Sequence, residues 1–438
     1  MLEPDHLRYR QVILPGGTPL PDYGGFCVSE IPALVQDLLV APDDVSRPLS
    51  QWARHRVNRH PNAVVHFLLD GLGMNHWARH LKPETQNGFV RLLTQKGNVT
   101  PLTAVFPCST APNLTSVHSG DEPITHGLME WYQYLPAVNM VIKALPFTHA
   151  HSKEPEKLSD GYGKVDPTVL YNGSTIYERL RLKGIQSIIF LPGQFVSSSY
   201  SSVVLRGADV VGCRDISDLA VQVRKCLENS ARPLYIYAYW DTIDGVSHQY
   251  GPHSEECLAT IRSIGHALET ELINGLSWRA ASDAVFMLSA DHGHIQVDPA
   301  ETIYLDEFKY LNDCFAHGHR GLQILPWGGH RCMFMRIEAE RREEAVRFLA
   351  SELAGRAVIW NSSAALASGL FGYGDQHPEL SERIGNIMIL PTGKRMISYR
   401  YSNKEPEESR GHHGGLSDDE RLIPLALANL PHLCGVEE

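Results

Sequence analysis

The sequence "VFMLSADHGH", residues 285–294, joins a run of apolar residues to a carboxylate beside an imidazole. Its first part has the length and composition of a strand that is buried on both faces, as in a parallel sheet. Asp291 and His292 would then lie where this strand leaves its sheet. A loop whose Asp caps a helix would explain one such segment as well. The interpretation therefore depends on whether the pattern recurs.

Strand and helix patterns alternate from about residue 62 to residue 294. The short apolar runs that predict strands lie at 63–69, 187–192, 233–239 and 284–290. Helical periodicity lies between them, for example at 175–184 and 216–230. This alternation predicts an α/β fold with a mostly parallel central sheet that is flanked by helices on both faces.

Acidic residues follow three of the predicted strands. Asp70 comes directly after the first run, Asp244 and His248 lie just beyond the third, and Asp291 and His292 follow the fourth. The carboxyl ends of parallel strands meet at one edge of the sheet, which is where open α/β sheets bind ligands. Carboxylate oxygens and imidazole nitrogens suit divalent ions such as Zn²⁺. We therefore expect a metal site at this edge.

The segment from residue 105 to residue 128 predicts a helix with a hydroxyl at its start. Ser109 or Thr110 suits the N-cap, Pro112 suits the first turn, and Gly120 lies where a helix that ends near His118 would stop. Free backbone N–H groups and the positive end of the helix dipole favour a bound phosphate at such a position. The alternative is that Thr110 only caps the helix.

Composition excludes several classes of partner. The chain has 438 residues, of which 43% are hydrophobic and 20% charged, as in soluble globular proteins. Its formal net charge of -11 argues against a nucleic-acid polymer or an anionic membrane as the main partner. No apolar run is long enough to span a bilayer. A small phosphorylated substrate remains compatible, because bound metal ions invert the local field.

Two further observations concern the cellular compartment. Residues 1–17 contain acidic residues and no apolar core of the signal-peptide kind. The eight cysteines are scattered and form no C-x-x-C pair, a pattern typical of reduced thiols. Both observations favour a cytoplasmic location.

The pattern of predicted helices and strands changes after residue 295. Segments 328–337, 338–355 and 383–401 predict a small α+β subdomain. We therefore expect a catalytic core made of residues 1–295 and 396–438, and an insertion made of residues 296–395. His330 lies in a glycine-rich part of this insertion. Its side chain either faces the substrate or belongs to a solvated loop, and the sequence does not decide between the two.

Together, these segments resemble the type I phosphodiesterase/nucleotide pyrophosphatase family of the alkaline phosphatase superfamily. The resemblance rests on "LLDGLG", "FPCSTAPN", "D..D...H.YGP", "SADHG" and "GHHGG", which occur in the family's order between about residue 62 and residue 416. It implies an alkaline-phosphatase-like sandwich fold. No single motif is specific, but the ordered set is.

The resemblance also implies two zinc ions per chain, with another divalent ion such as Mn²⁺ as an alternative. The implied ligands are Asp70, Asp291 and His292 for one ion, with Thr110 as a further contact, and Asp244, His248 and His413 for the other. His413 is chosen over His412 because the family's ligand directly precedes a glycine. Thr110 matches the catalytic nucleophile, and Asn113 matches the amide that holds a phosphate oxygen.

The implied reaction is hydrolysis of a phosphodiester or pyrophosphate through a phospho-threonine intermediate. Diesters are expected to be preferred to monoesters because no cation lies beside Thr110 in the sequence; Arg206, Arg320 or Arg331 would change this by folding over the site. Three alternatives stay open: a phosphomonoesterase, a phosphonoacetate-type hydrolase, and an inactive metal-binding scaffold. The sequence does not predict an oligomeric state.

Overall fold

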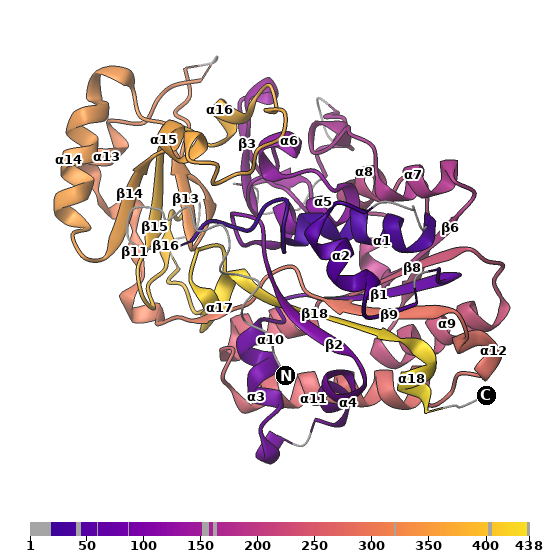
Figure 1. The fold of residues 1–438 in the computed structure, drawn as a ribbon. Helices are drawn as coiled ribbons and strands as arrows, with labels where there is room; N and C mark the ends of the chain where they lie inside the picture. The colour runs from indigo at the N-terminus through magenta and orange to yellow at the C-terminus, as the bar shows by residue number, and fades with distance from the viewer. Residues whose placement is uncertain are drawn as a thin grey trace.

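The structure, a computed structural model, describes residues 19–40, 45–58, 60–85, 87–150, 157–160, 164–318, 321–401 and 405–435. Its centre is a seven-stranded sheet (Figure 1). In spatial order the strands are β2 (Asn98–Thr103), β18 (Leu422–Asn429), β9 (Ala284–Ser289), β1 (Ala63–Leu69), β8 (Leu234–Trp240), β6 (Gln186–Pro192) and β7 (Asp209–Cys213). β18 runs antiparallel to the other six strands, which all point the same way. The predicted mostly parallel α/β sheet is therefore confirmed.

The strands at the middle of the sheet are the ones that the sequence predicts. All residues of β1 and β9 are buried, which explains their uninterrupted apolar runs. In the shared register, Leu69 of β1 pairs with Trp240 of β8, and Leu68 pairs with Ser289 of β9. The three strands therefore end at nearly the same level.

Helices cover both faces of the sheet (Figure 1). One layer contains α1 (Ile31–Val40), α5 (Thr110–Ser119) and α7 (Ile176–Leu182), which contact one another. The other layer contains α4 (Gly88–Lys96), α9 (Ile216–Asn229) and α11 (Glu255–Ala267). The predicted helices at 175–184 and 216–230 correspond to α7 and α9.

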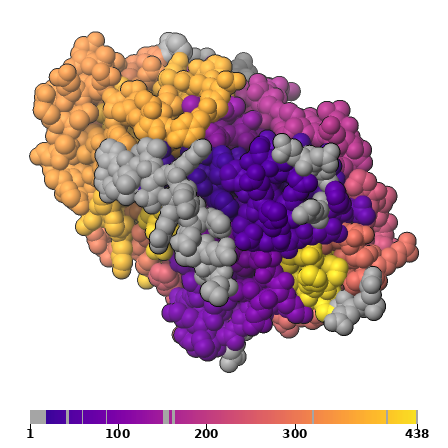
Figure 2. Space-filling view, in the orientation of Figure 1, coloured from indigo at the N-terminus to yellow at the C-terminus, as the bar shows by residue number. Residues whose placement is uncertain are grey.

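A second sheet forms one end of the molecule (Figure 1, orange). It is antiparallel, with the order β12 (Trp327–Gly329), β13 (Cys332–Met335), β15 (Ile387–Pro391) and β14 (Ala357–Asn361), and α14 (Arg342–Glu352) packs against it. It has its own apolar core, whose buried residues lie between Ile303 and Ile397. In the space-filling view, the residues of the second sheet and its helices lie at one end of the molecule. N-terminal residues cover the middle of the face that is shown (Figure 2).

A third, three-stranded sheet joins the two parts. It consists of β3 (Tyr132–Leu135), β4 (Met140–Lys143) and β5 (Thr148–His149). Its buried residues share an apolar cluster with Trp327 and Phe334 of the second sheet. The core and the insertion are thus packed together here, and the division at residues 296 and 395 stays a prediction.

Within the described residues, no helix combines the length and apolarity that crossing a membrane requires. The eight cysteines are free. The prediction about residues 1–17 lies outside the described residues, and the cytoplasmic location stays a prediction.

Candidate active site

The three aspartates predicted at strand ends converge at one edge of the central sheet. Asp70 follows β1, and its backbone N–H donates to the Trp240 carbonyl at the end of β8 (3.0 Å). Asp291 lies two residues beyond β9. Asp244 lies in the first turn of α10 (Thr242–Tyr250), the helix that follows β8. Neighbouring parallel strands of matched length therefore place carboxylates from distant parts of the sequence side by side.

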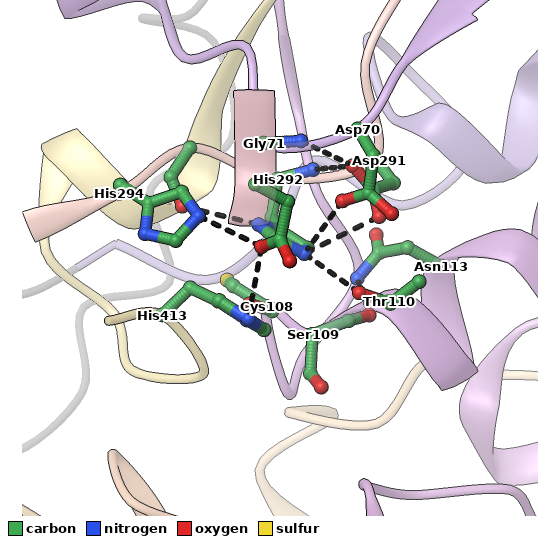
Figure 3. Close-up of polar contacts among 12 residues, drawn as sticks. Asp70, Gly71, Cys108, Ser109, Thr110, Asn113, Asp291, His292, His294 and His413 are labelled. Atoms are coloured by element: carbon green, nitrogen blue, oxygen red, sulfur yellow. Dashed lines mark hydrogen bonds and ion pairs between the residues drawn. The ribbon is translucent and has the colours of Figure 1, made fainter. Parts of the chain in front are cut away.

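Asp70, Asp291 and His292 form the first cluster of possible metal ligands (Figure 3). Nε2 of His292 lies 3.4 Å from Oδ1 of Asp70 and 3.3 Å from Oδ2 of Asp291. The three side chains are almost fully buried. Atoms bound at 2.0–2.1 Å by a tetrahedral zinc lie about 3.3 Å apart, so these spacings fit one ion.

The two carboxylates of this cluster each keep one oxygen without a partner. Oδ2 of Asp70 accepts a hydrogen bond from the Tyr239 hydroxyl, and Oδ1 of Asp291 accepts from the backbone N–H groups of Gly71 (3.1 Å) and His292 (2.9 Å). Oδ1 of Asp70 and Oδ2 of Asp291 are buried and have no hydrogen-bond partner. These are the oxygens that face Nε2 of His292. Unpaired buried carboxylate oxygens are costly, so their convergence fits a cation.

Electrostatics agrees with this geometry. Burial, and then the nearby Asp291 carboxylate, raise the pKa of Asp70 well above its ordinary value. Burial also raises the pKa of Asp291, although His292 opposes the change. Without a cation, the two carboxylates therefore resist ionisation. A divalent ion would remove this repulsion and hold both in the charged form.

Asp244, His248 and His413 form the second cluster. Oδ1 of Asp244 lies 3.4 Å from Nε2 of His248 and 3.5 Å from Nε2 of His413, and the two nitrogens are 3.2 Å apart. All three spacings again match the edges of a tetrahedral zinc site. Burial raises the pKa of Asp244, but the surrounding imidazoles, first His248, outweigh this and hold it well below its ordinary value.

In both clusters, hydrogen bonds at Nδ1 leave Nε2 of each histidine available to a metal. Nδ1 of His248 donates to the Gly411 carbonyl (2.9 Å), and Nδ1 of His413 donates to the Cys108 carbonyl (3.2 Å). Nδ1 of His292 lies 3.2 Å from the Gly293 carbonyl and donates to it in the same way. A carbonyl can only accept, so each ring keeps the lone pair of Nε2 free for a metal.

His412 is held away from this role. Its Nδ1 accepts the backbone N–H of His413 (3.0 Å), so its Nε2 carries the proton and donates to Nδ1 of His330 (2.8 Å). Nε2 of His330 then donates to Glu407 (2.9 Å). The insertion thus contributes His330 as a support for the segment that carries His413, an alternative that the sequence did not raise.

Thr110 lies beside the first cluster (Figure 3). It is the first residue of α5, after the N-cap residue Ser109, and the helix ends at Gly120 in the left-handed conformation (φ 84°). The Thr110 hydroxyl lies 3.0 Å from Nε2 of His292. The structure thus brings the predicted nucleophile to the predicted ligands.

Asn113 has a different position from the one expected. Its side-chain NH₂ donates to the carbonyls of Ser109 (2.8 Å) and Pro107 (3.2 Å), and its Oδ1 accepts the Val105 N–H (2.8 Å). The side chain is fully buried. Both amide hydrogens are used within the turn, so no donor remains for a phosphate oxygen. This geometry corrects the expected phosphate contact: Asn113 holds the turn that precedes Thr110.

The sequence interpretation missed His294. Its Nε2 lies 2.8 Å from Oδ1 of Asp244, and it belongs to a group of close ligand atoms with Asp244, His292 and His413. The signal was present in "ADHGH", where a second histidine follows the predicted ligand at a spacing of two residues.

Comparisons with known proteins agree on one family. The family model described as Type I phosphodiesterase / nucleotide pyrophosphatase matches residues 64–416. An uncharacterized pyrophosphatase/phosphodiesterase of Schizosaccharomyces pombe is 25% identical over 362 residues, which cover 81% of this chain and 68% of that protein. Human ectonucleotide pyrophosphatase/phosphodiesterase family member 1 is 26% identical over 219 residues, 48% of this chain and 21% of that protein.

Solved structures of similar fold include two kinds of enzyme. Murine ectonucleotide pyrophosphatase/phosphodiesterase 5, an inactive variant in complex with AMP, has a TM-score of 0.61 and 16% identity; the match covers 84% of this chain and 88% of that chain. Phosphonoacetate hydrolase from Sinorhizobium meliloti 1021, in complex with phosphonoformate, has a TM-score of 0.59 and 15% identity, with coverages of 87% and 95%. At these identities the likeness concerns the fold alone.

Proposed function

The chain belongs to the type I phosphodiesterase/nucleotide pyrophosphatase family, and from this premise we propose that it hydrolyses a small phosphodiester or pyrophosphate with Thr110 as nucleophile and two zinc ions as cofactors. The observation that carries the proposal is the 3.0 Å contact between the Thr110 hydroxyl and Nε2 of His292. It supports the proposal because the Thr110 oxygen lies beside the first cluster of possible metal ligands. The second cluster lies next to the first, since the His292 and His413 rings stack at 3.6 Å.

The proposed ions would be held by the two clusters. Asp70, Asp291 and His292 would hold one, and Asp244, His248 and His413 the other. Bound there, two divalent ions supply electrostatic stabilisation for the attacking and leaving oxygens of an in-line displacement. Zinc is proposed because the donors are carboxylate oxygens and imidazole nitrogens at tetrahedral spacings, and Mn²⁺ remains the alternative.

The chain's own residues define the chemical steps. The Thr110 hydroxyl releases its proton to solvent as its oxygen attacks phosphorus, the bond from phosphorus to the leaving oxygen breaks, and phospho-Thr110 forms. The leaving oxygen takes a proton from solvent. Water then attacks phospho-Thr110, which restores the hydroxyl and releases the second product. The N–H groups of Thr110 and Ala111, at the start of α5, provide fixed dipoles for the phosphate oxygens.

The distribution of cations supports a diester substrate. A phosphate monoester carries a second charge, which enzymes often bind with an arginine fork. Arg331 donates to both carboxylate oxygens of buried Glu420 (3.0 and 3.2 Å), and Arg206 is held by Glu178 and the Gly173 carbonyl. Arg331 and Arg206, two of the three arginines that could have folded over the site, are thus bound elsewhere. The third, Arg320, lies outside the described residues. In the described part of the chain, no Arg or Lys side chain bonds to Thr110.

The test compares kcat/KM for bis(p-nitrophenyl) phosphate, p-nitrophenyl phosphate and phosphonoacetate under one set of conditions. We expect the diester to be favoured over the monoester by about 10- to 100-fold, which corresponds to one missing charge-assisted hydrogen bond. A clear advantage for the monoester or the phosphonate would favour the corresponding alternative. Absence of turnover on a wider panel of phosphate esters, with both ions bound, would favour the inactive scaffold.

A further inference from the structure

His294 lies at the second cluster but outside both predicted ligand sets (Figure 3). The side chain is fully buried, and its Nε2 lies 2.8 Å from Oδ1 of Asp244. Its other nitrogen, Nδ1, is buried without a hydrogen-bond partner. Burying a polar ring with one nitrogen unpaired is costly. The hydrogen bond between Nε2 and Asp244 is therefore the contact that explains why a histidine occupies this position.

The distances distinguish a hydrogen bond from metal ligation. Oδ1 of Asp244 lies 3.4 to 3.5 Å from Nε2 of His248 and of His413, as expected for atoms that share one tetrahedral ion. The contact with His294 is shorter, at 2.8 Å. This is the length of an N–H···O⁻ hydrogen bond. An ionised carboxylate only accepts, so His294 is the donor and carries its proton on Nε2.

The surrounding backbone holds this contact in place. A Cβ at Gly71 (φ +77°) would lie 3.0 Å from Cα of Asp244 and 3.0 Å from Cδ2 and Nε2 of His294. Only a glycine therefore leaves room for the two residues to meet. The side-chain amide of Asn75 donates to the His294 carbonyl (3.1 Å), which anchors its backbone.

We propose that His294 is a positioning residue that orients the Asp244 carboxylate for the second metal ion. One lone pair of Oδ1 accepts from Nε2–H of His294, which leaves the other directed toward the ion between His248 and His413. This inference rests on the two-ion function proposed above, and it adds to that function a residue that sets the affinity of one ion and not of the other. Hydrogen bonds of this kind fix the orientation of metal ligands and raise their affinity.

The test uses the metal alone, with no substrate. Zn²⁺ affinity is measured on metal-free protein by competition with a chromophoric chelator, for wild type, His294→Leu and His294→Gln. We expect His294→Leu to weaken one of the two ions by about 10- to 100-fold and to leave the other unchanged. Gln can donate from nearly the same place as Nε2, so His294→Gln should recover most of the affinity.

His80→Leu is the matched control. His80 is also fully buried, with one bonded nitrogen (3.2 Å to Asn87) and one nitrogen without a partner. Its replacement should lower the melting temperature without changing either Zn²⁺ affinity. If His294→Leu does not fold, His294→Met, which also lacks the donor and fills a similar volume, takes its place in the comparison with His294→Gln.

Several results would overturn the proposal. If His294→Leu bound both ions as tightly as wild type, the hydrogen bond to Asp244 would have no effect on metal affinity. If His294→Gln lost an ion as completely as His294→Leu, His294 would itself be a metal ligand. Wild-type protein that binds fewer than two ions would contradict the proposed function instead. The two failures are therefore distinguishable.

Discussion

Thr110 is the residue on which the proposed covalent route depends. Thr110→Ala should abolish turnover and leave the content of bound metal nearly intact, because the protein ligands of both clusters remain. Thr110→Ser should keep part of the activity, since the hydroxyl survives and only a methyl group is lost. The measurements are kcat on the best diester and metal analysis of each variant. Normal turnover by Thr110→Ala would replace the covalent route with direct attack by water.

Glu130 is a buried carboxyl group that is bonded to Ser109, the residue before Thr110. It accepts hydrogen bonds from the Ser109 hydroxyl (2.9 Å) and the Trp131 N–H (2.8 Å), and its other oxygen has no partner. Burial is the main reason that its pKa rises from the ordinary 4.5 to about 7. The folded-state pKa exceeds the unfolded-state value. The stability linked to this group is therefore fully present below about pH 4.5 and is lost as the pH rises through about 7.

Glu130→Gln should weaken the dependence of protein stability on pH. The amide is neutral and keeps a carbonyl for Ser109 and Trp131, so the free energy of unfolding between pH 5 and pH 8 should fall less than in wild type. The difference is on the order of 3 kcal/mol at most. Denaturant unfolding at both pH values measures it. Glu343→Gln, at an exposed position, is the control; equal pH slopes for Glu130→Gln and wild type would show that Glu130 stays ionised.

At the scale of elements, the turn before α5 is held by Asn113. Asn113→Ala should leave the buried Val105 N–H without its partner, at a cost of about 1 to 3 kcal/mol. Because Thr110 directly follows this turn, kcat should fall together with the melting temperature. Both are measured on the same preparation.

Asn87→Ala provides the comparison. Asn87 is also buried and caps α4, which lies in the opposite helix layer from α5, through the Val90 N–H (3.1 Å). It should lose similar stability and keep kcat. If Asn113→Ala instead lowered kcat/KM without any change in stability, Asn113 would be a phosphate contact, as the sequence alone suggested.

The elements of the sheet differ in how well the sequence predicts them. The apolar runs at 63–69 and 187–192 agree with β1 and β6 to within a residue, because strands buried on both faces have few polar interruptions. β7 is an edge strand with partly exposed residues, so its pattern is weak. β18 joins the sheet between β9 and β2 from the far end of the chain. No local pattern reveals such a long-range antiparallel pairing.

Side-chain contacts were less predictable than elements. The side chains at the six predicted metal-ligand positions lie close together, and their role as ligands stays a prediction. The role of Asn113 did not follow from its motif, because sequence spacing does not state whether an amide faces the ligand or its own turn. The contact of His294 with Asp244 depends on the close approach of α10 and the segment after β9 to Gly71, which no single segment encodes.

At the scale of the whole molecule, the two clusters tie together segments that are more than 300 residues apart in sequence. Asp70 and His413 come from opposite ends of the catalytic core, and the buried ligands of the first cluster carry unpaired oxygens. Bound ions should therefore stabilise the whole fold. Removal of metal with a chelator should lower the melting temperature, by an amount that corresponds to about 4 kcal/mol for each ion present at 1,000 times its Kd. Metal analysis of the untreated protein should find close to two ions per chain.

Asp70→Asn should change the melting temperature in opposite directions with and without metal. In metal-free protein it replaces a carboxyl group whose ionisation burial and Asp291 oppose by a neutral amide, so the variant should melt above wild type. In zinc-saturated protein it removes a ligand, so the variant should melt below wild type and bind one ion fewer. Asp375→Asn, at an exposed position, should be neutral in both conditions. Shifts of the same sign in both conditions would mean that the Asp70 carboxylate is tolerated without a cation, and the first metal site would then have to be abandoned.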